Sequence, residues 1–472
     1  MRVTATCRVI AVLWSFLPAL AATGQQAPAT RGQGPLTLEE VLKQVDAYYP
    51  KLRGADAERQ SFAAKRLSKQ GAFDTAVSFS TDYLAYNSSG TLKTGATNDI
   101  VVEVPTRYGP KFFAGARLNL GSVKAPDSNT GSFGEYLLGV KLPLLRGLGI
   151  NEKAAQEQQA ILGERVADQI FAGTRLEVLF KAATVYWKWV AAGRKVDLAR
   201  DLLKVAQVRA EGIREEFRQG ATAGIVVAEA EQEVARREGS LAKAERDFQE
   251  AGFALSLFLW GPDGARRPQP TAERVPELIS EPKAFTPEQV AEGKRIALER
   301  RPELKALRLS REITQVDERL ARNDRLPTVD IVFNPGADIG RGAVGGTLKA
   351  GLVFAMPLQL REATGRINEA RLKIEKINQE ERLTREAILV EVDDAVSAVN
   401  AAYQRYLAAE KELEQARRVE QGERDQLAAG LSTLFLVNQR ERATFEAAIR
   451  VIEAQVEYEQ AVALYRAVTG QL

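Results

Sequence analysis

Few side chains in this sequence could do chemistry. The 472 residues include no histidine, one cysteine (Cys7) and two methionines, of which Met356 is the only one past the first residue. Zinc, copper and haem sites draw mainly on imidazole and sulfur ligands, so we predict no metal site and no cofactor. Catalysis through a histidine is excluded for the same reason. Carboxylate chemistry, as in a hydrolase, stays open, but no pair of acids is singled out by its context, and we predict that the protein is not an enzyme.

The overall charge gives no sign of a nucleic-acid partner. Sixty-five basic residues against 62 acidic ones leave a net charge of +3, in a chain that is 45% hydrophobic and 27% charged. This small, dispersed charge predicts no binding to nucleic acid. Arg266 and Arg267 could form an anion site, but they lie in a Pro-rich polar stretch, residues 261–285, that is more typical of a solvated linker.

The N-terminus is typical of an exported protein. MRVTATCR carries two arginines, VIAVLWSFLPAL is a short apolar core, and Ala19-Leu20-Ala21 supplies small residues for cleavage; together they predict a signal peptide at residues 1–21. Cys7 precedes the apolar core, so it is not placed as a lipid anchor. Residues 22–35 are small and polar and predict a disordered lead-in. Later apolar runs fall short of the ~20 residues of a spanning helix, so insertion into a membrane would require β-strands.

The rest of the sequence repeats one plan. We expect a first repeat at 36–260, the linker at 261–285 and a second repeat at 286–472. Each repeat opens with a threonine suited to cap a helix, Thr37 or Thr286, and then reaches Pro50 or Pro302. A charged amphipathic helix, a pair of strands, the tripeptide Ile-Asn-Glu and a long helical segment follow in both repeats.

Alternating residues predict two strand pairs, one in each repeat. The pairs are expected at about 76–86 with 133–145 and at 327–334 with 346–358. In the first strand Val77, Phe79 and Tyr83 face one way and the serines between them the other. This pattern is typical of a transmembrane barrel and also of any half-buried sheet.

An extra segment, residues 87–132, lies between the strands of the first pair. It contains DIVVEVP and FFAGARLNLG. It could be an extracellular loop with a hairpin of its own, with Tyr108, Phe112 and Phe113 at the membrane interface. The aromatic residues could equally pack within that hairpin.

Two similar glycine turns interrupt the long helical segments. FRQGATAG at 217–224 and LAAGLSTL at 427–434 each place a hydroxyl residue two positions after the glycine. The turns are 210 residues apart and the Ile-Asn-Glu tripeptides 217, a difference of one heptad. Heptads then run away from both turns in a common register: Val227, Val234, Leu241, Phe248 and Leu255, and Val437, Thr444, Val451, Tyr458 and Tyr465. We predict two long helical hairpins with tips near 220 and 430, whose second helices are capped by Thr222, or by Ser432 with Thr433.

Four strands cannot close a barrel alone. The smallest spanning barrels need about eight strands, and an open edge is not tolerated in lipid. Two copies would give about eight strands around an interior filled by side chains, whereas three copies would give about twelve and room for a lumen. If the chain inserts as a conduit, we expect at least three copies.

These features together resemble the TolC family of outer-membrane efflux proteins, over nearly all of the chain past the signal peptide. The resemblance rests on the duplicated plan, on Tyr-Pro-x-Leu and Arg-Pro-x-Leu at 49–52 and 301–304, and on the two G-x-[ST] turns. It implies an α+β fold: a trimeric outer-membrane β-barrel, with four strands per protomer and twelve in all, continued by a long α-helical coiled-coil tunnel in the periplasm.

The implied function is that of a passive exit duct in a tripartite efflux or type I secretion system. The implied partners are two further copies of the chain, a periplasmic membrane-fusion adaptor, an inner-membrane pump and the lipid of the outer membrane. A non-channel periplasmic coiled-coil adaptor or scaffold is the main alternative.

The resemblance also places both glycine turns at the periplasmic mouth, as gate and adaptor contact. The residues concerned are Gly220, Thr222, Val226, Val227, Gly430, Ser432, Thr433, Leu436, Val437, Gln439 and Arg440. Well-known family members carry aspartates just after these turns, where this sequence has Val226, Leu436 and Gln439. We therefore hypothesise that the mouth closes by apolar packing of Val226 and Leu436, with Arg440 and Glu441 forming polar links between helices.

Overall fold

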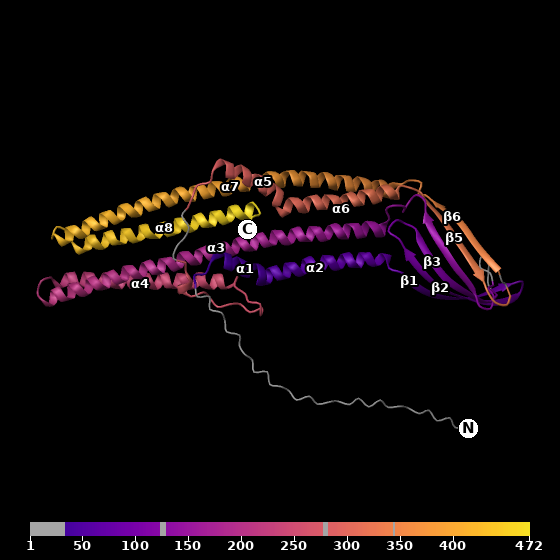
Figure 1. The fold of residues 1–472 in the computed structure, drawn as a ribbon, viewed down its shortest axis with the longest axis horizontal. Coiled ribbons are helices and arrows are strands. Elements are labelled where there is room, and N and C mark those ends of the chain that lie inside the picture. Colours follow the sequence, from indigo (N-terminus) through magenta and orange to yellow (C-terminus); the bar gives the residue numbers. More distant parts are fainter. Residues whose placement is uncertain (1–33, 123–128, 277–281, 343–344) are drawn as a thin grey trace, which may run out of the picture.

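The protein is long and narrow in the computed structural model (Figure 1). The structure describes residues 34–122, 129–276, 282–342 and 345–472. A β-sheet lies at one end and the turns of two long helical hairpins lie at the other. The predicted signal peptide, and the lead-in except for its last two residues, lie outside the described residues.

Helices follow the same order twice. The first set is α1 (Leu38–Tyr48), α2 (Pro50–Gln70), α3 (Glu152–Arg218) and α4 (Gly224–Ser256). The second is α5 (Pro287–Arg300), α6 (Pro302–Asp324), α7 (Arg361–Ala428) and α8 (Leu434–Val468). Two short 3-10 turns, η1 (Gly71–Phe73) and η2 (Ala272–Arg274), complete the helical elements of the described residues. With 67 residues and a rise of 1.5 Å per residue, α3 is about 100 Å long. The predicted internal duplication is confirmed.

The short helices begin where the sequence predicts. Thr37 accepts a hydrogen bond from the backbone N–H of Glu40 at 3.2 Å, and Thr286 forms a capping box at the start of α5. The proline of each Y/R-P-x-L motif is the first residue of α2 or α6, a position where its missing N–H costs nothing. Leu52 and Leu304, the leucines of these motifs, are buried, so each motif both starts a helix and anchors it.

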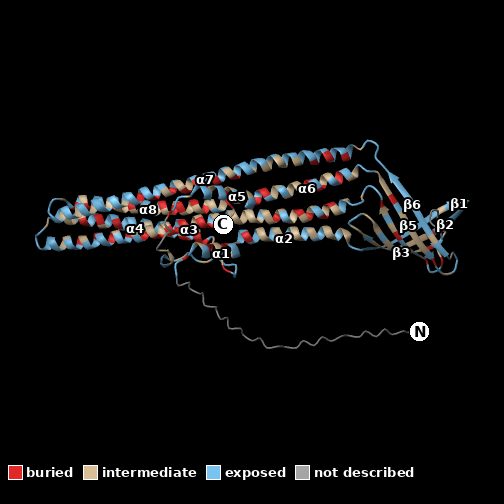
Figure 2. Cartoon of the chain, turned by 45° about the horizontal axis from the view of Figure 1, so that its top comes forward, coloured by how far each residue is buried: buried red, intermediate tan, exposed pale blue. Residues whose placement is uncertain are grey.

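The largest core lies midway along the molecule, where α1 packs against α3. Figure 2 shows buried positions gathered there. Trp189 of α3 is fully buried, and the Tyr186 hydroxyl donates a hydrogen bond to the carbonyl oxygen of Leu36 at 2.8 Å. This core fixes the first repeat on its long helix, far from both ends. Among the described residues, none of the helices has a stretch long and apolar enough to cross a membrane.

The sheet has six strands rather than four. They are β1 (Ala76–Ser88), β2 (Thr91–Pro105), β3 (Lys111–Gly121), β4 (Glu135–Pro143), β5 (Thr328–Asp338) and β6 (Gly345–Ala355). They pair antiparallel in sequence order. β1, β4, β5 and β6 coincide with the predicted strands, whereas β2 and β3 lie within 87–132.

The prediction of four strands per protomer is therefore wrong. β2 pairs with β1 over its whole length, from Ala76 opposite Glu103 to Ser88 opposite Thr91. The strands are joined by a tight turn at Ser89 and Gly90, both with positive φ, which suits a two-residue hairpin. The hairpin offered as one reading of 87–132 is present as β2 and β3, but the first half of β2, TLKTGATND, is polar on both faces and gave no strand signal.

One face of the sheet is apolar across all six strands. Because side chains alternate, the register sets Phe79 opposite Ile100, and Ile331 opposite Leu352. The other face carries cross-strand ion pairs, at 2.7 Å between Arg117 and Asp99 and at 2.9 Å between Lys141 and Asp330.

The three aromatic residues of the extra segment have different places. Phe112 lies on the apolar face and is half exposed. The ring of Phe113 lies on the polar face against Gly139, which stands opposite it on β4. Tyr108 lies in the turn between β2 and β3 and is 74% exposed. Only Phe113 is packed within the sheet.

Candidate functional site: the hairpin tips and a buried ion-pair cluster

The two hairpin tips have the same backbone geometry. Gly220 and Gly430 each have φ +75°, a conformation that costs residues with a Cβ atom free energy. Gly220 donates its N–H to Phe217 at 2.9 Å and Ala221 donates to Glu216 at 2.8 Å; the equivalent bonds of the second tip have the same lengths. Both helices thus end in the same hydrogen-bonded glycine cap.

Capping of the helix after each turn differs. Thr433 is the N-cap of α8 and accepts a hydrogen bond from the backbone N–H of Leu436 at 3.4 Å, as predicted. The N-cap of α4 is Ala223, which has no side chain to accept one. The predictions for Thr222 and Ser432 are wrong, because each lies one residue before the N-cap. Ser432 instead hydrogen-bonds the carboxylate of Glu423.

An apolar cluster joins the two tips. Val226 of α4 packs in it with Leu434 of α8, and its other members are Ala210, Ile213, Ala230 and Val234. Within this chain the second tip contributes Leu434 to the cluster, rather than Leu436, and closure of the mouth by Val226 and Leu436 stays a prediction. Val437 is buried, while Val227 and Leu436 are half-buried.

The polar residues predicted at the second tip have different surroundings. Gln439 and Arg440 are exposed, and Arg440 lies 3.5 Å from the carboxylate of Glu423. Glu441 is 1% exposed. The hypothesis of polar links between helices holds for Glu441, which lies in a cluster of charged residues.

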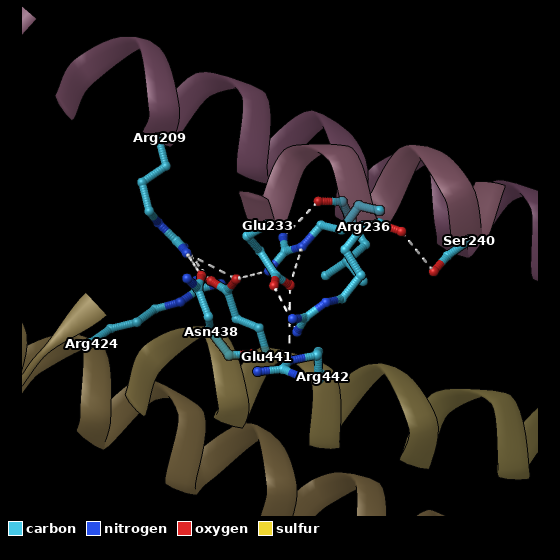
Figure 3. A network of polar contacts seen from close by, with 10 residues as sticks. Arg209, Glu233, Arg236, Ser240, Arg424, Asn438, Glu441 and Arg442 are labelled. Atoms are coloured by element: carbon cyan, nitrogen blue, oxygen red, sulfur yellow. Dashed lines mark hydrogen bonds and ion pairs between the residues drawn. The ribbon is translucent and has the colours of Figure 1, made fainter. Parts of the chain in front are cut away.

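Glu441 joins all four helices of the two hairpins (Figure 3). The Arg237 guanidinium of α4 donates to Glu441 Oε2 at 2.7 Å, and that of Arg424 of α7 donates to Oε1 at 2.9 Å. Arg209 of α3 contacts both carboxylate oxygens, and also donates to Asn438 Oδ1 at 2.9 Å. One carboxylate thus holds a guanidinium from each of the other three helices.

A second acid completes the cluster. Glu233 is 5% exposed and accepts a hydrogen bond from Arg237 at 3.0 Å, and it also lies 3.3 Å from Arg236. Arg237, itself 3% exposed, donates further to the carbonyl oxygen of Leu202 at 2.9 Å. Each buried charge therefore has partners, which is the condition under which buried ion pairs are tolerated.

The cluster keeps Glu441 ionised. Burial by itself would raise the pKa of Glu441, but hydrogen bonds from Arg209 and Arg237 outweigh it and lower the pKa to about 2. A carboxyl whose pKa is lower in the folded state stabilises the fold above its unfolded pKa, near 4.5. This contribution is lost as the pH falls from about 4.5 toward 2, so the link is intact at neutral pH.

Sequence reasoning missed most members of the cluster. Arg209, Glu233, Arg237, Arg424 and Asn438 were not predicted. A signal was present in the heptads: Arg237 follows Val234 by three residues and Glu441 follows Val437 by four, so both lie on the apolar stripe. Across the described residues, no group of three or more His, Cys, Asp or Glu side chains is arranged to hold a metal ion.

Comparison with known proteins finds a family match in the second repeat. Residues 295–471, within the second repeat, match the family model described as outer membrane efflux protein. Over these residues the chain is similar to the outer membrane efflux protein family. No curated protein matches the sequence.

Solved structures share its fold. The outer membrane channel CmeC of Campylobacter jejuni is 14% identical, with a TM-score of 0.64, over 92% of this chain and 85% of that one. The outer-membrane channel OprN is 16% identical, with a TM-score of 0.62, over 92% and 90%. The open state of the MtrE outer membrane channel of Neisseria gonorrhoeae is 14% identical, with a TM-score of 0.63, over 92% and 89%. The predicted resemblance is confirmed: the matching family model and these solved structures are all of outer-membrane efflux proteins or channels.

Proposed function

We propose that three copies of this chain form the exit duct of a tripartite efflux or type I secretion system. The duct passively exports small molecules or proteins from the periplasm, or from an inner-membrane pump, to the exterior. The observation that carries this proposal is the shape: a sheet with one apolar face continues into helices about 100 Å long that end in two matching tips. A sheet in the outer membrane then places the tips deep in the periplasm.

The apolar face supports contact with lipid. Phe79, Leu352 and Phe354 are each about two-thirds exposed in the single chain. An exposed apolar surface that extends over six strands is typical of contact with a membrane or another protein. The polar face, with its ion pairs between Arg117 and Asp99 and between Lys141 and Asp330, suits the water-filled side of a pore.

Exposed apolar residues support the tips as the contact with a periplasmic adaptor. Ile225 is 75% exposed, Leu431 is 80% exposed and Phe435 is 57% exposed. These residues surround the proposed contact positions at Gly220, Thr222, Val227, Gly430 and Gln439. Apolar side chains held outward on a rigid turn are suited to bind another protein.

We infer that the mouth closes without a ring of acids. The Val226 and Leu434 cluster and the Glu441 ion pairs fix the first hairpin against the second. A closed mouth requires the hairpins to stay together, and opening must separate groups that are costly to leave unpaired. The apolar cluster and the Glu441 ion pairs therefore hold the two hairpins of each copy together in the closed state.

The proposed function is tested by fractionating cells and separating the protein by electrophoresis without boiling. We expect an outer-membrane trimer resistant to detergent. Phe79→Lys, on the apolar face, should reduce insertion, since a lysine facing lipid costs up to about 2–4 kcal/mol, depending on its depth in the bilayer. Ser80→Lys, one residue on and on the polar face, is the matched control and should insert. A soluble periplasmic monomer in the wild type would instead support the adaptor or scaffold alternative.

A further inference from the structure

The turn between β2 and β3 is fastened to the helical end of the sheet. Arg107 in this turn holds the carboxylate of Glu157, on α3, with two hydrogen bonds of 2.7 Å. Asn151, the N-cap of α3, donates a hydrogen bond to the carbonyl oxygen of Arg107 at 3.1 Å. The backbone N–H of Gly149 donates to the carbonyl oxygen of Tyr108 at 3.0 Å. Residues 91–121 therefore return to the start of the helices and cross the sheet twice, as β2 and β3.

All six strands are long enough to cross a membrane. β1 to β6 have 13, 15, 11, 9, 11 and 11 residues, and a tilted transmembrane strand needs about 9–11. The apolar face continues over the extra strands, where Ile100 of β2 stands opposite Ala116 of β3. β2 and β3 thus match the neighbouring strands both in length and in having one apolar face.

The two edges of the sheet are complementary. Within the sheet of the described residues, β1 and β6 each have one neighbour, so each has one row of unpaired backbone groups. Six antiparallel strands leave the edges running in opposite directions, so that β6 of one copy can pair antiparallel with β1 of another. Unpaired strand edges are not tolerated in lipid. Further copies of the chain can pair with both edges, because each copy offers a β6 edge to β1 and a β1 edge to β6.

We propose that β1 of each copy pairs with β6 of its neighbour, so that three copies of six strands close an eighteen-stranded barrel instead of a twelve-stranded one. This rests on the trimer of the proposed function. Barrels of sixteen to eighteen strands leave an aqueous channel, whereas only α2, α3, α6 and α7 of each copy join the sheet to the tunnel. The barrel is then not the narrow part of the duct.

The register of this contact follows from the ends of the strands. β6 ends at Ala355 and β1 begins at Ala76, both at the helical end of the sheet. Setting these residues opposite each other pairs all of β6 with residues 76–86. It places exposed Asp82 of one copy opposite exposed Lys349 of the next on the polar face, like the ion pair between Asp99 and Arg117 inside the sheet.

The apolar face agrees with the same register. Phe79 then stands opposite Leu352, and Tyr83 opposite Leu348, with all four side chains among the most exposed apolar residues. A slip of one residue would turn every apolar side chain of one strand to the polar face of the other. The proposed register therefore satisfies both faces, and a slip by an odd number of residues is excluded.

Cysteine cross-linking tests the proposed contact between β1 of one copy and β6 of its neighbour. Asp82→Cys combined with Lys349→Cys, oxidised in outer membranes, should give a covalent oligomer on reducing-agent-free denaturing gels, at least tenfold above either single variant and the wild type. Asp82→Cys with Leu348→Cys, which the register sets on opposite faces, is the matched control and should not cross-link.

In one twelve-stranded alternative β1 and β2 leave the sheet and β6 meets β3 of the next copy; in another β2 and β3 leave, β1 keeps its contact with β6, and only the strand count separates it from the proposal. In the first alternative Lys349→Cys would cross-link to Asn119→Cys, which stands level with Asp82 across the sheet. That result, or twelve strands in a density map of the detergent-solubilised protein, overturns the proposal. Either outcome leaves the exit-duct function standing, whereas a soluble monomer contradicts the function itself.

Discussion

The two repeats share a helical plan but differ at both of its ends. The glycine turns have the same φ and the same hydrogen bonds, yet the first repeat supplies four strands and the second two. Positions 210 residues apart are equivalent at the tips, so Glu231 corresponds to Glu441. Glu231 is exposed and pairs with Arg214 on α3 of its own hairpin, whereas Glu441 is buried among three arginines. The two repeats share the threonines and prolines that begin their short helices and the glycines at the ends of α3 and α7. The residues packed around an equivalent position differ between the repeats, and they determine whether its side chain is exposed, like Glu231, or buried in an ion-pair cluster, like Glu441.

Replacing these equivalent acids should give the largest difference. Glu441→Ala leaves Arg209 and Arg237 without their carboxylate in a buried site, which we expect to cost about 3–5 kcal/mol. Glu231→Ala removes an exposed ion pair worth about 0–1 kcal/mol. Thermal loss of helical circular dichroism in detergent measures both. Equal shifts of the two midpoints would contradict the assignment of Glu441 as the link between hairpins.

Replacing the tip glycines should give a smaller effect, equal in both repeats. Gly220→Ala and Gly430→Ala each place a Cβ atom in open space, so only the left-handed backbone is penalised, by about 1–2 kcal/mol. Gly212 and Gly422 are equivalent glycines inside α3 and α7, also facing open space. Changing either to alanine should stabilise its helix by about 0.5–1 kcal/mol. Unequal effects at the two tips, measured by the same thermal midpoints, would show that one turn is held by contacts beyond this chain.

Local signals made the helical hairpins predictable from the sequence. Glycine followed by a hydroxyl residue, and a proline at the first position of a short helix, specify a turn or a helix start with few distant contacts. The strands of clear alternation, such as β1 and β6, were predictable for the same reason. The first half of β2 was not, because it is polar and gives no period, and the place of β2 in the sheet is set by its pairing with β1.

Contacts between distant segments could not be predicted in the same way. The Glu441 cluster joins residues more than 200 positions apart, such as Arg209 and Glu441, and heptads indicate only that their helices pack. Within the single chain Val226 packs with Leu434 of the second tip, a contact that the pattern did not predict, and closure by Val226 and Leu436 stays a prediction. The contact with Leu434 depends on the rotation of α8 against α4, which the sequence pattern leaves open.

The central claim is that an outer-membrane duct is kept closed at its tips by Glu441. Single-channel recording of the purified protein in planar bilayers tests it most directly, with Glu231→Gln as the matched control. We predict that the wild type and Glu231→Gln stay mostly closed, and that Glu441→Gln, in which Arg209, Arg237 and Arg424 repel one another without a central charge, opens more often and to a larger conductance. Identical recordings from Glu441→Gln and the wild type would contradict this account.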